Sequence, residues 1–138
     1  MALDVGEKTV GIAVSDELGI TSSPRETLRR DGTELQRLAD IVRGESIGEV
    51  VVGLPISLDG TLGPSAARSN ELATRLRELV TIPVVTWDER LTTAEAEKML
   101  IAADVRRSKR RQVIDQIAAS LILQSYLRSR SLAMDEDP

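Results

Sequence analysis

Three acidic side chains in this sequence stand where the neighbouring residues are largely apolar. Asp4 interrupts an apolar run near the start of the sequence, and Glu89 follows a later apolar run. Asp115 lies at the margin of the packing face of a helical pattern. An ionised carboxylate in such surroundings is costly unless another charge compensates it. Together the three acids would raise one another's pKa values, and divalent cations would remove that penalty.

The absence of histidine and cysteine from the chain limits the chemistry that these acids can serve. A Ser-His-Asp triad, a thiol nucleophile and a cysteine-bound zinc ion are excluded. Hydrolysis would depend on carboxylates, on lysine or on a metal that acidifies water. Ligands made only of oxygen suit Mg²⁺ or Mn²⁺. We therefore predict a site for Mg²⁺ or Mn²⁺ formed by Asp4, Glu89 and Asp115, with Asp88 as the alternative second acid.

Each of these acids alone also has a structural interpretation. Asp4 could accept a hydrogen bond from the turn that follows it, and Glu89 could be a surface acid at a strand end. Asp115 could pair with Arg111, one helical turn earlier. We disfavour all three interpretations together, because the expected topology brings the acids to one edge of a sheet.

Length and composition indicate one globular domain over residues 1–138. The chain is 41% hydrophobic and 29% charged, with one Trp, one Tyr and no Phe, so its core must be aliphatic. No apolar run approaches the roughly 20 residues of a membrane span, and no signal peptide is recognisable. We predict a cytoplasmic protein with no membrane partner. A net charge of −4 argues only weakly against a nucleic-acid partner, since charge distribution matters more than the sum.

The predicted elements are three antiparallel strands, a helix, a strand, a helix, a strand and two helices. They fall at about 2–5, 10–14, 19–28, 31–43, 48–55, 65–80, 82–89, 92–103 and 110–128, and residues 131–138 form a tail that we expect to fray. Strands that alternate with helices require parallel pairing with right-handed crossovers. The expected fold class is α/β, a mixed sheet of five strands with helices on both faces and an antiparallel edge.

This topology explains why the acids should converge. In open α/β sheets, ligands bind beyond the carboxyl ends of the strands, where the strand order reverses. Asp4 lies near the end of the first strand, Gly53 ends the fourth, and Asp88 and Glu89 end the fifth. The last helix adds Asp115.

Basic residues are concentrated just before the helix that carries Asp115, at Arg106, Arg107, Lys109, Arg110 and Arg111. Cations at a helix N-terminus oppose the macrodipole, and contact with phosphates would compensate that cost. A solvated helix start is the alternative. Lys8 and Arg90 lie beside two of the acids and could touch the same nucleic-acid backbone. The loop at 57–63 could close over it or could be a surface connection.

Four blocks of the sequence, in order and over nearly the whole chain, resemble the YqgF family, also called RuvX. They are DVGEKTVGIAVSD, VVGLPISLDGTLG, TWDERLTTAEAEKML and DQIAASLILQSYL. The family is described as pre-16S rRNA nucleases and as Holliday junction resolvases. The resemblance implies an RNase H-like fold and a metal-dependent phosphodiesterase. By position, Asp4 is the first-strand acid, Glu89 the acid of the DER block and Asp115 the final-helix acid.

The mechanism expected from this resemblance uses two metal ions about 3.5–4 Å apart that flank the scissile phosphate. Asp4 is the best candidate to bridge both ions, while Glu89 and Asp115 would each hold one. We predict a nuclease that processes the 5′ end of pre-16S rRNA in ribosome biogenesis. An RNA precursor is favoured over branched DNA as the substrate.

Three alternatives remain open at this point. A Holliday junction resolvase would use the same residues, and a symmetric dimer would favour it. A non-catalytic nucleic-acid binding factor could keep the same fold. An actin-like or sugar-kinase ATPase would need two such lobes, and this chain has room for one. The sequence is compatible with a monomer or a homodimer.

Overall fold

The structure of the chain is a computed structural model. It describes residues 1–57, 59–90, 101–104 and 106–136. Within the last helix it leaves out the side chains at 107, 108, 110–116 and 131–136.

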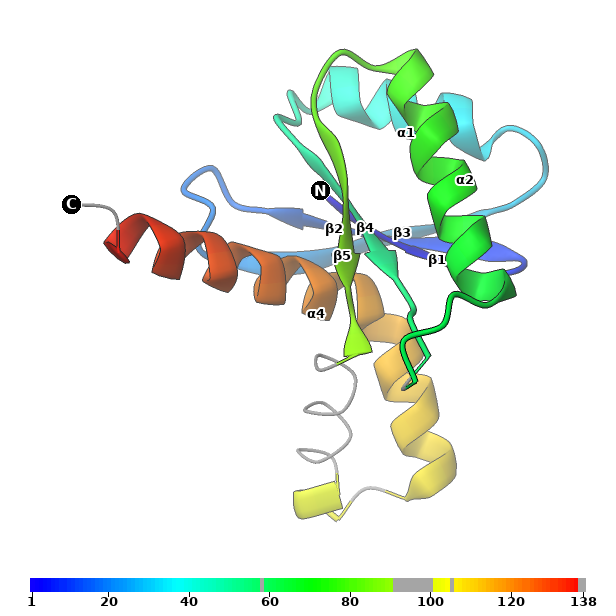
Figure 1. Cartoon of the computed structure of the whole chain (residues 1–138), viewed down its shortest axis with the longest axis vertical. Helices are drawn as coiled ribbons and strands as arrows, with labels where there is room; N and C mark the ends of the chain where they lie inside the picture. Colours follow the sequence, from blue (N-terminus) through cyan, green and yellow to red (C-terminus); the bar gives the residue numbers. More distant parts are fainter. Residues whose placement is uncertain (58, 91–100, 105, 137–138) are drawn as a thin grey trace.

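The centre of the fold is a five-stranded sheet with the order β3-β2-β1-β4-β5 (Figure 1). Its strands are β1 (Ala2–Val5), β2 (Thr9–Ser15), β3 (Ser22–Arg29), β4 (Val50–Leu54) and β5 (Val84–Asp88). β2 pairs antiparallel with both β1 and β3, whereas β4 pairs parallel with both β1 and β5. The prediction of a mixed α/β sheet with one antiparallel edge is confirmed.

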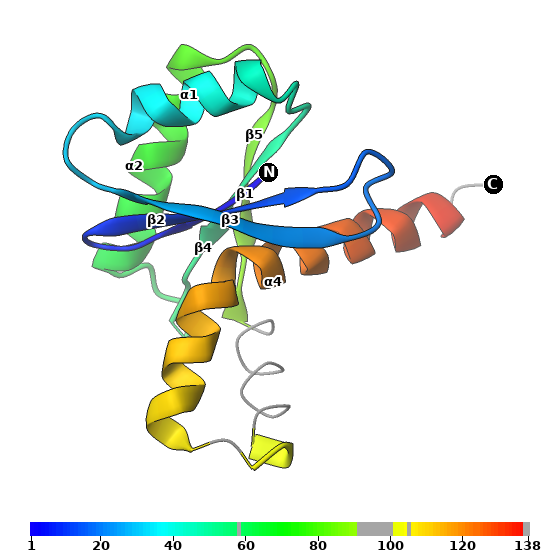
Figure 2. The ribbon, with the colours of Figure 1, turned by 180° about the vertical axis from the view of Figure 1, so that it is seen from behind.

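Helices cover both faces of this sheet, as predicted (Figures 1 and 2). α1 (Glu34–Gly44) and α2 (Pro64–Leu79) pack on one face, and α4 (Arg107–Glu136) packs on the other. α4 begins before and ends after the predicted helix at 110–128, and it includes most of the tail that was expected to fray. The helix predicted at 92–103 falls mainly on residues outside the described part of the chain. No described helix is long and apolar enough to cross a membrane.

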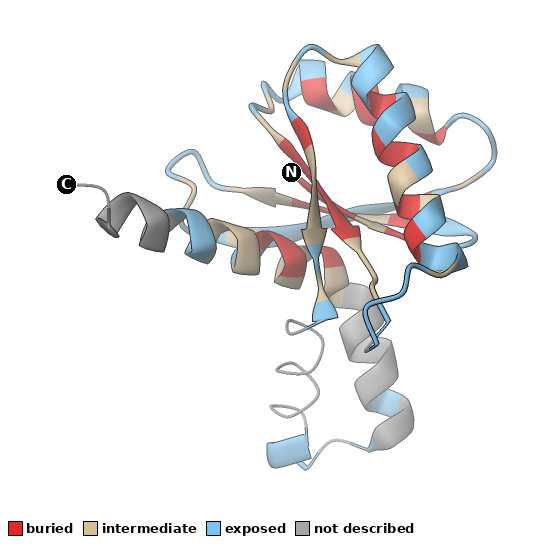
Figure 3. Ribbon diagram, in the orientation of Figure 1, coloured by how far each residue is buried: buried red, intermediate tan, exposed pale blue. Residues whose placement is uncertain are grey.

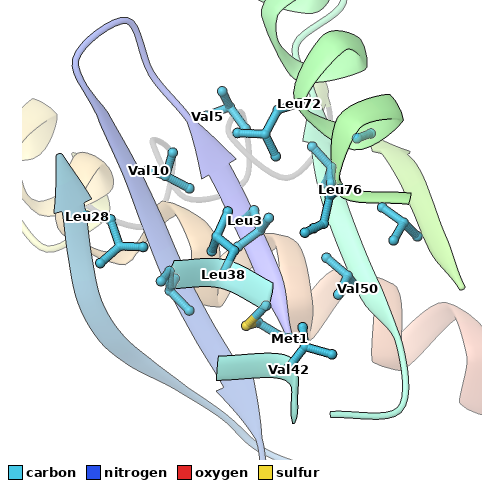
Figure 4. Packing of buried hydrophobic residues seen from close by; sticks show 14 residues of the cluster. Met1, Leu3, Val5, Val10, Leu28, Leu38, Val42, Val50, Leu72 and Leu76 are labelled. Carbon is cyan, nitrogen blue, oxygen red and sulfur yellow. The ribbon is translucent and has the colours of Figure 1, made fainter. Parts of the chain in front are cut away.

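Buried residues, red in Figure 3, lie in the strands and in the helices that pack on them. They form two clusters, one on each face of the sheet. Leu3 and Val5 pack with the helix residues Leu38, Leu72 and Leu76 in the larger cluster (Figure 4). The smaller cluster, against α4, contains Ala2, Ala13, Val51, Ala119, Ile122 and Leu123. Successive side chains of a strand point to opposite faces. Asp4 therefore lies on the face that α4 covers.

β3 is the outer strand of the antiparallel part of the sheet. Pro24 lies opposite Ala13, and the pairing register shifts between Gly11 and Ala13. Proline cannot donate a hydrogen bond to a neighbouring strand, so it is tolerated at an edge or beside a bulge. Because β2 runs antiparallel to both β1 and β3, the carboxyl ends of β1 and β3 lie at the same edge of the sheet.

Candidate active site at the carboxyl ends of β1 and β5

Asp4, in β1, is partly buried on the face of the sheet that α4 covers. It lies in register with Gly11 of β2. A Cβ atom placed at Gly11 would lie 3.7 Å from Cβ of Asp4 and 3.9 Å from Cβ of Ala119. The backbone itself closes the turn after β1, because the Gly6 amide donates to the Thr9 carbonyl at 2.8 Å. Asp4 thus faces the part of α4 around Ala119.

Glu89 follows β5 and extends the pairing with β4, because its amide donates to the Leu54 carbonyl at 3.3 Å. Val85 and Trp87 pack against the α4 cluster, so alternation places Glu89 on that face as well. Its carboxylate lies over Gly53 of β4. A Cβ atom at Gly53 would lie 2.5 Å from Cδ1 of Ile122 and closer still to Oε2 of Glu89. The missing side chain at Gly53 lets Glu89 extend across β4 toward Asp4.

The proximity of Asp4 and Glu89 has an electrostatic consequence. Burial raises the pKa of Glu89 to about 7, and repulsion from Asp4 and Asp88 adds to the rise. Two of the three predicted acids therefore repel each other in a partly buried place. A divalent cation would relieve this repulsion, and carboxylate oxygens suit Mg²⁺ or Mn²⁺. The donor chemistry of the pair fits the predicted metal.

Asp88, the alternative second acid, occupies a different position. It is exposed, and strand alternation directs it away from the α4 face. Its Oδ2 accepts hydrogen bonds from Nε and Nη2 of Arg90 at 2.9 and 2.7 Å, and its Oδ1 accepts one from the Arg90 amide at 3.0 Å. These bonds hold the pKa of Asp88 below its usual range. The geometry favours Glu89 over Asp88 as the partner of Asp4.

Asp115 lies in α4, one turn before Ala119 and two turns before Ile122. Ala119 is the helix residue beside Asp4 and Gly11, and Ile122 is the one beside Gly53. The position of Asp115 in the helix, on the side of Ala119 and Ile122, supports its predicted place in the site. The side chain of Asp115 lies outside the described residues. Among the side chains that the structure describes, which do not include Asp115, no group of three His, Cys, Asp or Glu residues is placed to hold a metal ion.

The predicted substrate-binding cations are placed unevenly. Lys8 is exposed in the turn between β1 and β2, and Lys109 is exposed in the first turn of α4. Arg90 is exposed and its guanidinium is bound to Asp88. The side chains of Arg107, Arg110 and Arg111 are outside the described set.

Gly11 and Gly53 were not predicted to take part in the site. Each is a strand glycine beside one of the two acids, on the α4 face of the sheet. A glycine inside a strand pattern often marks a close approach by another group. That signal was present in both strands, but it could not say which side chain fills the space.

Comparison with known proteins matches residues 1–129 to the RuvX family, described as Holliday junction resolvase. A protein of Geobacillus kaustophilus (strain HTA426) is 52% identical over 134 residues, which cover 94% of this chain and 97% of the relative. A Halalkalibacterium halodurans protein is 48% identical over 136 residues, covering 96% and 97%. A Desulforudis audaxviator (strain MP104C) protein is 46% identical over 132 residues, covering 94% of each. All three are named "Putative pre-16S rRNA nuclease".

Proposed function

Because this chain belongs to the RuvX family, we propose that it is a nuclease that hydrolyses phosphodiester bonds with divalent cations. The resemblance drawn from the four sequence blocks is thereby confirmed. The names of the curated relatives support pre-16S rRNA as its substrate, and the role proposed is processing of the 5′ end of this precursor in ribosome biogenesis. The observation that carries the proposal is the approach of Glu89 to Asp4 across Gly53.

Asp4 and Glu89 are the proposed ligands of Mg²⁺ or Mn²⁺, with Asp115 as the third. Asp4 is central because β2 and β4 flank β1 and because it faces α4. Asp4 would be the ligand shared by the ions, and Glu89 and Asp115 would each help to hold one of them. Bound there, divalent cations would lower the pKa of a coordinated water and stabilise charge on the leaving oxygen. Glu89 would then be held in its ionised form.

Cations around this edge are the proposed contacts to the substrate backbone. They are Lys8, Arg90, Arg107, Lys109, Arg110 and Arg111. Lys8 and Lys109 are exposed. Arg90 would have to exchange the Asp88 carboxylate for a phosphate. Such contacts give affinity that falls as salt concentration rises.

The substrate proposed is an RNA precursor, and a branched DNA junction is the second candidate because the family is described as a resolvase. A non-catalytic binding factor is the third. The family match lends no support to the ATPase alternative. A cytoplasmic location and the choice between monomer and homodimer stay predictions.

One cleavage assay separates these candidates. The purified protein is incubated with Mn²⁺ or Mg²⁺ and either an RNA carrying the 5′ extension of 16S rRNA or a four-way DNA junction. We expect cleavage of the RNA, and loss of cleavage in Asp4→Asn. Asp40→Asn is the matched control, since Asp40 is an exposed acid on α1 that contacts Gln36 and Arg43. Equal activity of Asp4→Asn and the wild type would refute the catalytic assignment, and cleavage of the junction alone would favour the resolvase.

A further inference from the structure

Many arginines on the described surface already neutralise acids of the same chain. The pairs are Arg25–Glu45, Arg30–Glu34, Arg37–Asp31, Arg43–Asp40, Arg75–Glu71, Arg90–Asp88 and Arg130–Glu49. Lys8 and Arg29 differ from them. Both are exposed, and within the described part of the chain neither side chain forms an ion pair or a hydrogen bond. Their positive charges are available to a ligand.

Strand register places Arg29 on the same face of the sheet as Asp4. Val10 and Leu28 pack in the cluster under α1 and α2. Thr9 and Arg29, which lie opposite each other in β2 and β3, therefore project to the α4 face.

The distance between Arg29 and the active site follows from the same register. Gly11 of β2 pairs with Asp4 of β1 on one side and with Thr27 of β3 on the other, so the three residues lie in one line across the sheet. Arg29 lies two residues beyond Thr27, toward the carboxyl edge. With strands about 4.8 Å apart and a rise of about 3.4 Å per residue, the Cα atoms of Asp4 and Arg29 are about 12 Å apart.

The sheet surface between these two residues is covered by α4 at Gly11, where Ala119 approaches, and is exposed toward the carboxyl edge. Thr9, Thr27 and Arg29 are exposed, and Gly11 carries no side chain. The exposed surface beside α4 thus consists of two hydroxyl-bearing side chains, Thr9 and Thr27. A sugar-phosphate backbone could lie along it without displacing a bulky group.

Arg30, which follows β3, anchors the turn that contains Lys8. Its amide donates to the Lys8 carbonyl at 2.9 Å, and its Nη1 donates to the Gly6 carbonyl at 3.1 Å. Its Nε lies 3.7 Å from Oε1 of Glu34, whose Oε2 accepts a hydrogen bond from the Gly32 amide at 2.8 Å. Lys8 and Arg29 therefore project from one anchored edge of the sheet.

We propose that Lys8 and Arg29 form a phosphate-binding edge that holds the nucleic-acid strand on the β2–β3 side of the scissile bond. This proposal rests on the nuclease function proposed above and adds a direction to it, since it assigns part of the strand a path past Thr9 and Thr27, beside α4. The chain carries a net charge of −4, so an anionic strand needs local groups of unpaired cations such as this one. Arg29 is the residue that the sequence analysis did not assign.

The salt dependence of binding tests this edge directly. Binding of a fluorescein-labelled single-stranded RNA 20-mer is followed by anisotropy in EDTA, from 50 to 200 mM KCl. Arg29→Ala and Lys8→Ala are each expected to weaken binding about two- to fivefold. Each should also lower the slope of log K against log salt by about 0.7, the value for one single-strand phosphate contact. Arg29→Lys should restore the slope because it keeps the charge.

Arg128→Ala provides the matched control. Arg128 is exposed on α4 and, within the described part of the chain, forms no ion pair. It lies nine residues after Ala119, about 14 Å farther along the helix axis. Its replacement should leave both affinity and slope unchanged.

Cleavage kinetics supply the second readout. Arg29→Ala should raise KM and leave kcat near the wild-type value, since Arg29 lies away from the scissile bond. If Arg29→Ala and Lys8→Ala bind RNA with the same affinity and salt slope as Arg128→Ala, the proposed phosphate-binding edge is wrong and the nuclease proposal stays intact. A wild-type protein that neither binds nor cleaves nucleic acid would overturn both. The same titration with a DNA 20-mer shows whether the edge distinguishes RNA from DNA.

Discussion

Gly53→Ala tests the most specific steric feature of the site, the space over β4 that the Glu89 carboxylate occupies. The added methyl group would lie 2.5 Å from Cδ1 of Ile122 and closer to Oε2 of Glu89, whereas ordinary van der Waals contact begins near 3.4 Å. Each group would have to move by about 1 Å. The Glu89 side chain can rotate away, but Ile122 is 2% exposed and packed in the α4 cluster.

The expected cost combines two opposing effects. Overpacking of a buried site costs about 1–3 kcal/mol. Replacing a strand glycine with alanine restores about 0.5–1 kcal/mol through a smaller loss of backbone entropy. We therefore expect a net loss of about 1–2 kcal/mol, which for a domain of this size lowers Tm by about 3–8 °C. Displacement of Glu89 should also weaken Mn²⁺ binding by about tenfold or more.

Gly11→Ala is the matched control, because it adds the same methyl group on the other side of Asp4. The nearest atoms would then lie 3.7–4.0 Å away, which is ordinary contact. Its stability should equal or slightly exceed that of the wild type. Thermal unfolding and calorimetric titration with Mn²⁺ measure both effects. Identical stability and Mn²⁺ affinity in the two variants would refute the argument that Gly53 makes room for Glu89.

Two further predictions follow from the Glu89 carboxylate. Its folded-state pKa of about 7 lies above its usual value of 4.5, so folding favours the protonated form, and this group reduces stability as pH rises from about 4.5 through 7. In EDTA, Glu89→Gln should therefore stabilise the protein at pH 8, by at most about 3 kcal/mol at about 1.4 kcal/mol per pKa unit, and should have little effect at pH 4. Urea unfolding at the two pH values measures this, and an equal effect at both would contradict it. Mn²⁺ binding to the wild type should weaken below pH 6 and release protons near pH 7, because the cation needs the ionised carboxylate. Calorimetry in buffers of different ionisation enthalpy measures the protons released, and affinity independent of pH from 5.5 to 8 would contradict this prediction.

Local periodicity was sufficient to predict the architecture. The aliphatic runs and the helical spacing of Leu35, Leu38 and Val42 report backbone conformation within a few residues, and conformation is set largely by neighbours in the chain. Pro24, which lacks an amide donor, is compatible with an edge strand or a bend, and the structure has it in the outer strand β3. Handedness rules then limited how the strands could be joined. Asp4 and Glu89 could therefore be placed at one edge of the sheet from sequence patterns alone.

The contacts that make this edge a candidate site depend on residues far apart in the chain. Glu89 and Asp88 are adjacent and both acidic, and only the position of α4 shows which of them lies on the same face as Asp4. The reason for a glycine at position 53 is visible only in the folded chain, where Ile122 and Glu89 occupy the space that a side chain would need. In the sequence, nothing distinguishes Arg29 from the other basic residues. Only the pairing of β3 with β2 and of β2 with β1 places Arg29 on the same face of the sheet as Asp4. Proximity in space arises from tertiary packing, which no short stretch of sequence encodes.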